Sequence, residues 1–109
     1  MALKANIVID QGTDFSTSIN VTNDDGDIVD LTGYTAAAQM RKHYTSANAY
    51  NFTTSISAGQ GIVTISMTAN TTAAITAGRY VYDCELTSSS NAVTRLVEGI
   101  VTVTPQVTR

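Results

Sequence analysis

His43 is the only histidine in the chain, so it is the first residue to test for acid-base or metal chemistry. A single histidine excludes a multi-histidine metal site. A catalytic triad built on His43 would need a nucleophile motif such as G-x-S-x-G, which the sequence lacks. His43 follows Arg41 and Lys42 in a polar stretch. That setting predicts a solvated loop histidine.

Cys84 is the only cysteine, so no disulfide can form within the chain. It alternates in phase with Tyr80, Tyr82 and Leu86. This pattern predicts a buried thiol that packs as a small apolar side chain. A reactive thiol is the alternative, and it would require an exposed, electropositive setting.

Carboxylates occur in two groups that could do chemistry. The first group is Asp24, Asp25, Asp27 and Asp30. Closely spaced carboxylates suit Ca²⁺, but this run lacks the twelve-residue spacing and the terminal glutamate of an EF-hand, so an acidic hairpin tip is favoured over a calcium site. The second group is Asp83 and Glu85, which share one face of a predicted strand and could imitate a glycosidase pair. A small sandwich offers no obvious cleft between them, so we expect a solvated face.

Phosphate-binding and nucleic-acid-binding signals are weak. Gly59 and Gly61 flank a single residue, without the Lys-Ser/Thr of a P-loop or the third glycine of a dinucleotide fingerprint. The net charge is −3, and the six basic residues are scattered rather than gathered on one face. We therefore expect no enzyme activity, no cofactor, no bound metal and no nucleic-acid partner.

The composition indicates one small β-rich domain. The 109 residues are enough for one domain and too few for two. Only 14% of residues are charged, and threonine, serine, alanine and asparagine take their place, which favours strands with neutral polar faces. No apolar run approaches the roughly 20 residues that span a membrane. The first residues lack the apolar core of a signal peptide, so we expect synthesis in a cytoplasm without standard export.

Short alternating segments separated by turns predict the strands that would position these residues. The expected strands are residues 5–10, 15–21, 28–29, 35–42, 50–56, 62–67, 79–86 and 92–103. Residues 35–42 have high helix propensity in isolation, yet strand-like neighbours favour a strand. Asp25 and Gly26 predict a type I′ turn, and residues 71–78 a brief helical turn that ends at Gly78.

Segment 79–86 is expected to be the central strand of an all-β, immunoglobulin-like antiparallel sandwich of about seven strands. Tyr82 stands two residues before Cys84, as in the tyrosine-corner strand of that fold. The chain has neither a second cysteine nor a tryptophan, which excludes an antibody-type domain. We expect a single domain over residues 1–109, with a short N-terminal arm at 1–4 and an extended C-terminal tail at 104–109.

Several segments together resemble a family of small bacteriophage and prophage virion structural proteins. They are residues 11–15, 30–35, 39–42, 71–75, 77–83, 95–103 and 104–109. The resemblance covers nearly the whole chain, and its motifs are turns and strands rather than an active site. Similar immunoglobulin-like domains stand at the N-termini of phage baseplate proteins.

This resemblance implies a non-enzymatic assembly or docking module of the tail, baseplate or neck, located in the virion and assembled in the host cytoplasm. The implied partners are other virion proteins and further copies of the chain, with no nucleic acid and no membrane. One alternative is a capsid decoration protein. Another is a carbohydrate- or receptor-binding module, for which Tyr44 and Tyr50 would be stacking platforms. A small hydrolase is disfavoured, because no nucleophile and base stand together.

Overall fold

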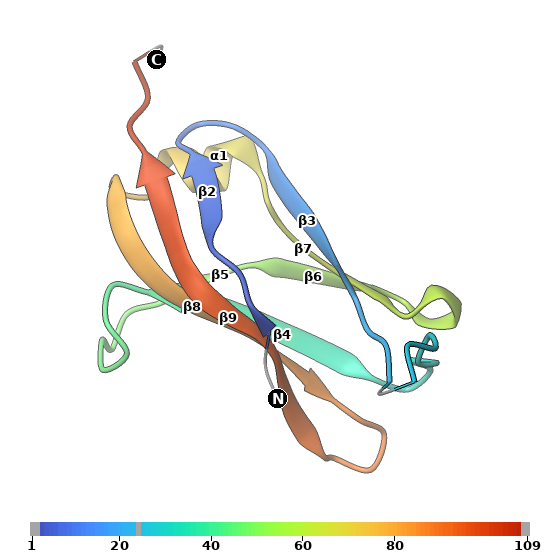
Figure 1. Ribbon diagram of the computed structural model, residues 1–109. Coiled ribbons are helices and arrows are strands. Elements are labelled where there is room, and N and C mark those ends of the chain that lie inside the picture. The colour runs from blue at the N-terminus through green and yellow to red at the C-terminus, as the bar shows by residue number, and fades with distance from the viewer. Residues whose placement is uncertain (1–2, 24, 108–109) are drawn as a thin grey trace.

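The computed structural model describes residues 3–23 and 25–107, and the strands within them form two sheets (Figure 1). The elements are β1 (Leu3–Lys4), β2 (Ile7–Asp10), β3 (Phe15–Asn20), β4 (Thr35–Arg41), β5 (Tyr50–Asn51), β6 (Thr53–Ser57), η1 (Ala58–Gln60), β7 (Ile62–Met67), α1 (Ala69–Ala73), β8 (Gly78–Thr87) and β9 (Val93–Thr104). The predicted all-β sandwich is confirmed.

The larger sheet, sheet A, has the order β1-β9-β8-β4-β5, with β2 also paired to β9. The smaller sheet, sheet B, has the order β3-β7-β6. The orders β3-β7-β6 and β9-β8-β4 correspond to the B-E-D and G-F-C strands of an immunoglobulin-like sandwich, whereas β1 and β2 pair with β9 instead of joining sheet B. Strand β8 lies between β9 and β4, as expected for the central strand. The chain passes from sheet A to sheet B at Phe52, which separates β5 from β6. The sequence predicted a single strand over residues 50–56, because the alternation of side chains continues through Phe52.

The strand expected at residues 5–10 is shortened to β2, and a further short strand, β1, precedes it. The pairing of both departs from the antiparallel expectation. Both β1 and β2 run parallel to β9, with Leu3 opposite Val97 and Ile7 opposite Val101. Leu3 and Lys4, which we expected in an N-terminal arm, thus form part of sheet A. Residues 1 and 2 of that arm lie outside the described residues.

A glycine in β9 allows the break between β1 and β2. A Cβ atom built on Gly99 would overlap the carbonyl oxygen of Ala5 and lie 2.8 Å from its carbonyl carbon. The same carbonyl oxygen accepts a hydrogen bond of 2.6 Å from the Tyr82 hydroxyl. The backbone N–H of Ile100 donates to Oδ1 of Asn6. Because Gly99 has no Cβ, the backbone of Ala5 can pack directly against β9 at the kink between β1 and β2.

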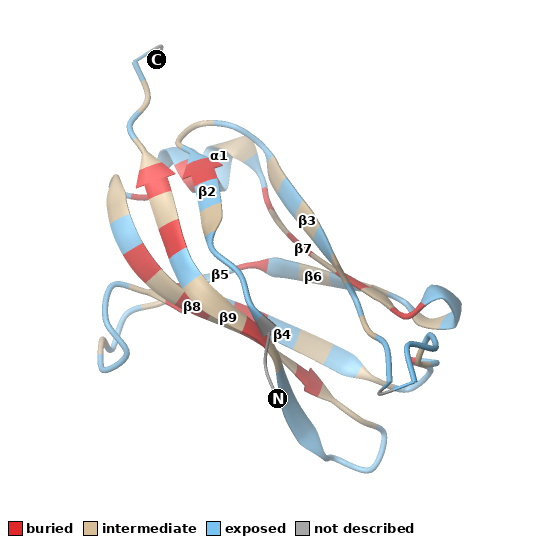
Figure 2. Ribbon diagram, viewed as in Figure 1, coloured by how far each residue is buried: buried red, intermediate tan, exposed pale blue. Residues whose placement is uncertain are grey.

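The core lies between the sheets and follows the alternation of the strands, as the bands of buried residues in Figure 2 show. Its buried apolar members are Ile9, Leu31, Ala38, Met40, Phe52, Val63, Ile65, Met67, Ile75, Tyr80, Tyr82, Cys84, Leu86, Val97, Val101 and Val103. Phe52 links the sheets, with its ring centroid 6.1 Å from that of Phe15 and 6.2 Å from that of Tyr82.

The alanine-rich segment is a strand, as predicted. Ala38 and Met40 on β4 are buried, opposite Cys84 and Tyr82 on β8. As a helix this segment could not place alternate residues on the core side. Tertiary pairing therefore overrides its intrinsic helix propensity.

The short helix begins earlier than predicted and does not end at a glycine. Thr68 caps α1 by accepting a hydrogen bond from the backbone N–H of Thr71, and the C-cap is Ala74. Gly78 is the first residue of β8. The hydroxyl of Tyr80 donates to the carbonyl oxygen of Thr76 at 2.6 Å. Tyr80, rather than the expected Tyr82, thus makes the upstream hydrogen bond typical of a tyrosine corner.

The acidic turn after β3 differs from the predicted type I′ turn. The backbone N–H of Gly26 donates to the carbonyl oxygen of Asn23 at 2.9 Å, which makes Gly26 the fourth residue of the turn. Its φ of +84° suits a glycine. The expected strand at residues 28–29 is reduced to a single bridge between Thr22 and Ile28.

The C-terminal tail is tied to the body as far as Gln106. Its backbone N–H donates to Oε1 of Gln11, and Nε2 of Gln11 donates to the carbonyl oxygen of Ile75. Thr104, expected in the tail, is the last residue of β9. Val107 is 91% exposed. Residues 108 and 109 lie outside the described residues.

Candidate interaction surface

The outer face of sheet B is an uncharged array of eight small polar side chains and one isoleucine, Ile62, which we call the hydroxyl face. Its members are Ser16, Ser18 and Asn20 on β3, Ile62, Thr64 and Ser66 on β7, and Thr53, Ser55 and Ser57 on β6. The strand register aligns them in three rows. The rows are Ser16-Ser66-Thr53, Ser18-Thr64-Ser55 and Asn20-Ile62-Ser57.

The hydroxyl face carries no charge, because none of the residues in β3, β6 and β7, all of which the structure describes, is acidic or basic. The hydroxyls of Ser18 and Thr64 lie 3.0 Å apart in the central row. Short hydroxyl side chains lose little conformational entropy when another surface covers them. With no charge to desolvate, covering this face costs less than covering an ordinary charged surface.

Strand β3 is an edge of sheet B, and its backbone polar groups are open on one side. The N–H of Val21 donates to the carbonyl oxygen of Gly61, which continues the register of Phe15 opposite Met67. In an antiparallel ladder, hydrogen-bonded residues recur at every second position. Phe15, Thr17 and Ile19 therefore direct their backbone groups toward β7. The backbone groups of the alternate residues point outward; those residues are Ser16, Ser18 and Asn20.

The other sheet edges are shorter or more protected. The opposite edge of sheet B, β6, lies beside β4, where Oγ1 of Thr54 donates to the carbonyl oxygen of Ala36. In sheet A, β5 has two residues, and β2 has four and ends at Asp10. Edge strands are commonly protected by charges, prolines, bulges or short length. Strand β3 has six residues and none of these protections.

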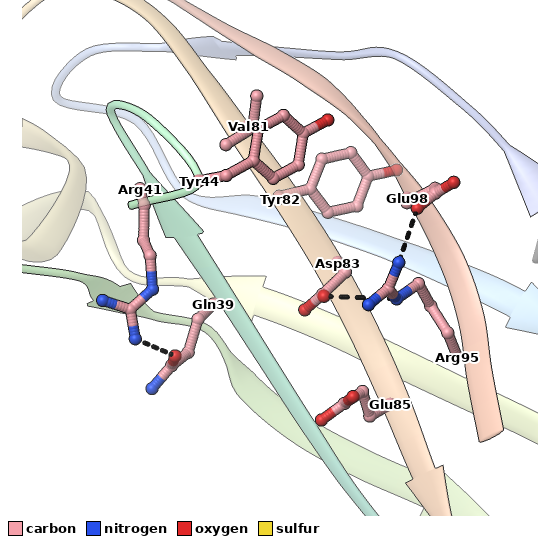
Figure 3. Close-up of a pocket in the computed structure, with 9 residues that line it drawn as sticks. All are labelled: Gln39, Arg41, Tyr44, Val81, Tyr82, Asp83, Glu85, Arg95 and Glu98. Atoms are coloured by element: carbon pink, nitrogen blue, oxygen red, sulfur yellow. Dashed lines mark hydrogen bonds and ion pairs between the residues drawn. The ribbon is translucent and has the colours of Figure 1, made fainter. Parts of the chain in front are cut away.

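The outer face of sheet A is charged, in contrast to the hydroxyl face. It contains an open hollow of about 330 Å³ (Figure 3). The residues that line it are Gln39, Arg41, Tyr44, Val81, Tyr82, Asp83, Glu85, Arg95 and Glu98. Arg95 bridges two carboxylates, with Nε 3.5 Å from Oδ2 of Asp83 and Nη1 3.1 Å from Oε2 of Glu98. All three side chains are partly exposed, so these ion pairs contribute little to stability.

Arg41 fixes the loop that carries Tyr44 beside this hollow. Its Nη1 donates to the carbonyl oxygens of Ser46 and Ala47, at 2.6 and 3.2 Å, and its Nη2 donates to Oε1 of Gln39 at 3.1 Å. Tyr44 is 82% exposed. One of the two expected stacking tyrosines therefore lies next to amide, carboxylate and guanidinium groups.

Tyr50, the other expected stacking residue, is not an open platform. It is half-buried and packs edge-on against Tyr80, with ring centroids 5.8 Å apart. Nζ of Lys42 lies 5.0 Å from the centroid of the Tyr80 ring. Burial raises the pKa of Tyr80 above its ordinary value, with a smaller contribution from Tyr50. Tyr50 therefore serves the packing at this end of sheet A.

His43 and Cys84 lie where the sequence predicted them. His43 is exposed in the loop after β4, and its backbone N–H donates to Oγ of Ser46. Cys84 is fully buried in β8. Burial, with smaller contributions from the charges of Asp83 and Glu85, raises the pKa of its thiol to about 11. Neither residue is part of the hydroxyl face or of the hollow.

The raised pKa makes Cys84 inert toward thiol reagents. At pH 8 a thiol with a pKa of about 11 is ionised to about one part in a thousand. We expect Ellman's reagent to label the protein only after unfolding in guanidinium, whereas a Ser90→Cys control at the exposed β8–β9 turn should label at once. Rapid native labelling of Cys84 would contradict its burial.

The raised pKa also makes stability depend on pH. Because the folded state retains the Cys84 thiol proton, the free energy of unfolding should fall as pH rises from about 9 toward 11.

Local hydrogen bonds hold the segment that carries the first group of carboxylates. Oδ1 of Asp30 accepts hydrogen bonds from the hydroxyl and the backbone N–H of Thr32, and these lower its pKa. Oδ1 of Asn23 accepts from the N–H groups of Asp25 and Asp27. Asp24 lies outside the described residues. Among residues 3–23 and 25–107, no group of three or more His, Cys, Asp or Glu side chains could hold a metal ion.

The second pair of carboxylates, Asp83 and Glu85, lies on the outer face of β8, where both side chains line the charged hollow. Asp83 is already paired with Arg95. The two share one strand face, as predicted, and lie along one wall of an open surface rather than across a cleft.

Comparison with protein-family models and with curated proteins finds no match to this chain. In the described part of the chain, no helix has the length and apolar character needed to cross a bilayer. Sequence reasoning anticipated neutral polar faces, but it missed the three-row register of the hydroxyl face. The signal was serine or threonine at most of the alternate positions of three strands, and their alignment depended on pairings that no single strand reveals.

Proposed function

We propose that this chain is a non-enzymatic docking subunit of a bacteriophage virion, placed in the tail, baseplate or neck. The observation that carries the proposal is the uncharged hydroxyl face, which is continuous with the open β3 edge. Such a surface can be covered by another protein at low desolvation cost, and an open edge can accept a further strand. The chain's resemblance to small virion structural proteins supports the same role.

The partners in this proposal are other virion proteins and further copies of the chain, brought together in the host cytoplasm. A capsid decoration protein would use the same kind of surface and differs in its number of copies. Mass spectrometry of purified virions of the source phage tests both. A small multiple of three or six copies per particle supports a neck or baseplate position, and hundreds support decoration. Absence from the particle rejects the virion role.

A charge at the centre of the hydroxyl face should block docking without unfolding the protein. Thr64 occupies the middle of the central row, and Thr64→Lys places an ammonium group there that any covering surface must desolvate. We expect at least about a tenfold loss of incorporation into particles, which corresponds to about 1.4 kcal/mol of binding free energy. The melting temperature should stay within a few degrees of that of the unsubstituted protein, because the side chain points outward.

Thr102→Lys is the matched control, since Thr102 lies on β9 and points to the outer face of sheet A. Incorporation should be unchanged in this variant. If both variants enter particles as well as the unsubstituted chain does, the hydroxyl face is not the docking surface.

A carbohydrate- or receptor-binding module is the second candidate, and the position of Tyr44 favours it. An exposed aromatic ring beside Gln39, Asp83 and Glu85 offers a stacking surface and hydrogen-bonding groups for a sugar. A glycan array tests this candidate. Binding that disappears in Tyr44→Ala would move the function from docking to recognition, whereas an array without signal removes this candidate.

A further inference from the structure

We propose that two copies of this chain pair through their β3 strands, antiparallel and about a two-fold axis at Ser18. The two three-stranded sheets then form one continuous sheet with the order β6-β7-β3-β3-β7-β6. This inference deepens the proposed docking function and rests on it, because it names a second copy of the chain as the first partner. Strand β3 is suited to this role because it has β7 on one side only (Figure 1).

The open backbone groups of β3 are symmetric about Ser18. They belong to Ser16, Ser18 and Asn20, at every second position. In an antiparallel pair centred on Ser18, Ser16 lies opposite Asn20 of the second copy, and Ser18 lies opposite Ser18. Each opposed pair exchanges two hydrogen bonds in such a ladder. This register satisfies every outward N–H and C=O group of the strand.

The side chains agree with the same register on both faces of the sheet. On the core side, Phe15, Thr17 and Ile19 are half-buried at the edge of the monomer. Thr17 would lie opposite Ile19 of the second copy, and Phe15 opposite Val21, so that apolar surface is covered. On the outer side, the rows of the hydroxyl face continue across the axis.

A second copy fits this edge better than other occupants. Strand β3 has no charge, so its self-pairing brings no like charges together. The described part of the chain's own tail is unsuited as a strand donor, because it contains Pro105 and is anchored to Gln11 through Gln106. A charged partner strand would gain no ion pair here.

Cysteine cross-linking tests the register directly. In a hydrogen-bonded antiparallel pair the Cα atoms of opposed residues lie about 5.5 Å apart, which is within the range of a disulfide. Ser18→Cys should therefore form a covalent dimer under mild oxidation. Ser16→Cys is the control, since two copies of residue 16 would lie about 14 Å apart along the strands. Cys84 is buried and should not compete.

A proline substitution tests the same edge without a covalent cross-link. Ser18→Pro removes an N–H that points away from β7, so the ladder within the monomer keeps its hydrogen bonds. We expect the dimer to weaken at least about tenfold in analytical ultracentrifugation, because both copies lose a central donor. Ser18→Ala retains the N–H and should dimerise like the unsubstituted chain. Circular dichroism checks that Ser18→Pro remains folded.

Three results would overturn the inference: an unsubstituted chain that stays monomeric at about 1 mM, equal cross-linking of Ser16→Cys and Ser18→Cys, or a dimer unaffected by Ser18→Pro. The virion role is tested separately. A monomeric chain that is found in particles keeps the docking function and rejects the β3 dimer. A β3 dimer that is absent from particles keeps the inferred pairing and rejects the virion role.

Discussion

Gly99→Ala should lower the free energy of unfolding by about 3 kcal/mol, although it adds a single methyl group. That methyl group would overlap the carbonyl oxygen of Ala5, which is backbone and cannot move aside alone. Relieving the overlap displaces the junction of β1 and β2 and breaks the hydrogen bond from the Tyr82 hydroxyl to Ala5. Overpacking costs about 1–3 kcal/mol and a lost buried hydrogen bond about 1–3 kcal/mol, so their combined effect is near the stated value.

Thermal unfolding followed by circular dichroism measures this effect, and a decrease in melting temperature of roughly 10–20 °C is expected. Gly59→Ala is the matched control, because a Cβ at that position meets nothing within 4 Å. A Gly99→Ala variant as stable as Gly59→Ala would show that the first strand is not seated against β9 as described.

Thr72→Val should cost about 2–3 kcal/mol of unfolding free energy while it preserves the shape of the side chain. Thr72 is the one fully buried polar residue among those described. Its Oγ1 donates to the carbonyl oxygen of Thr13 at 2.7 Å and accepts from the N–H of Gly12 at 3.0 Å. Valine makes neither bond and leaves both backbone groups without this partner in a partly buried place.

Thr71→Val is the control for this substitution. Thr71 is exposed on the same helix, and its hydroxyl contacts only that of Thr68. Both changes replace threonine by another β-branched residue, so helix propensity largely cancels. Urea unfolding of the two variants should differ by about 2 kcal/mol. Equal stabilities would mean that Thr72 does not hold the β2–β3 turn against α1.

Much of the sandwich could be predicted from alternation alone, because the spacing of apolar residues shows which side of each strand faces the core. Strand β8 is the clearest case, with Tyr80, Tyr82, Cys84 and Leu86 all buried as expected. Alternation does not reveal the partner or the direction of a strand. The parallel pairing of β1 and β2 with β9, and the break at Gly99, therefore depended on contacts far apart in the sequence.

The candidate surface was predictable in its chemistry but not in its place. Serine and threonine at alternate positions of β3 indicated a polar outer face. No single segment, however, shows which edge of the sandwich stays open or how the rows align. The role of Tyr50 was mistaken for the same reason. Its exposure depends on Tyr80, which lies 30 residues later in the chain and packs against its ring.

The pairing of β2 with β9 has a consequence for the order of folding. Ile7 and Val101 are neighbours in sheet A, yet β9 is synthesised after every other described strand. Sheet B draws only on residues 15–67, so it can assemble on a growing chain while sheet A waits for its last strand. Contacts between such distant segments slow folding, because a long loop must close before they form. Until β9 is synthesised, the nascent chain carries the open β3 edge without a finished core, and at that stage the chain is most prone to unwanted strand pairing.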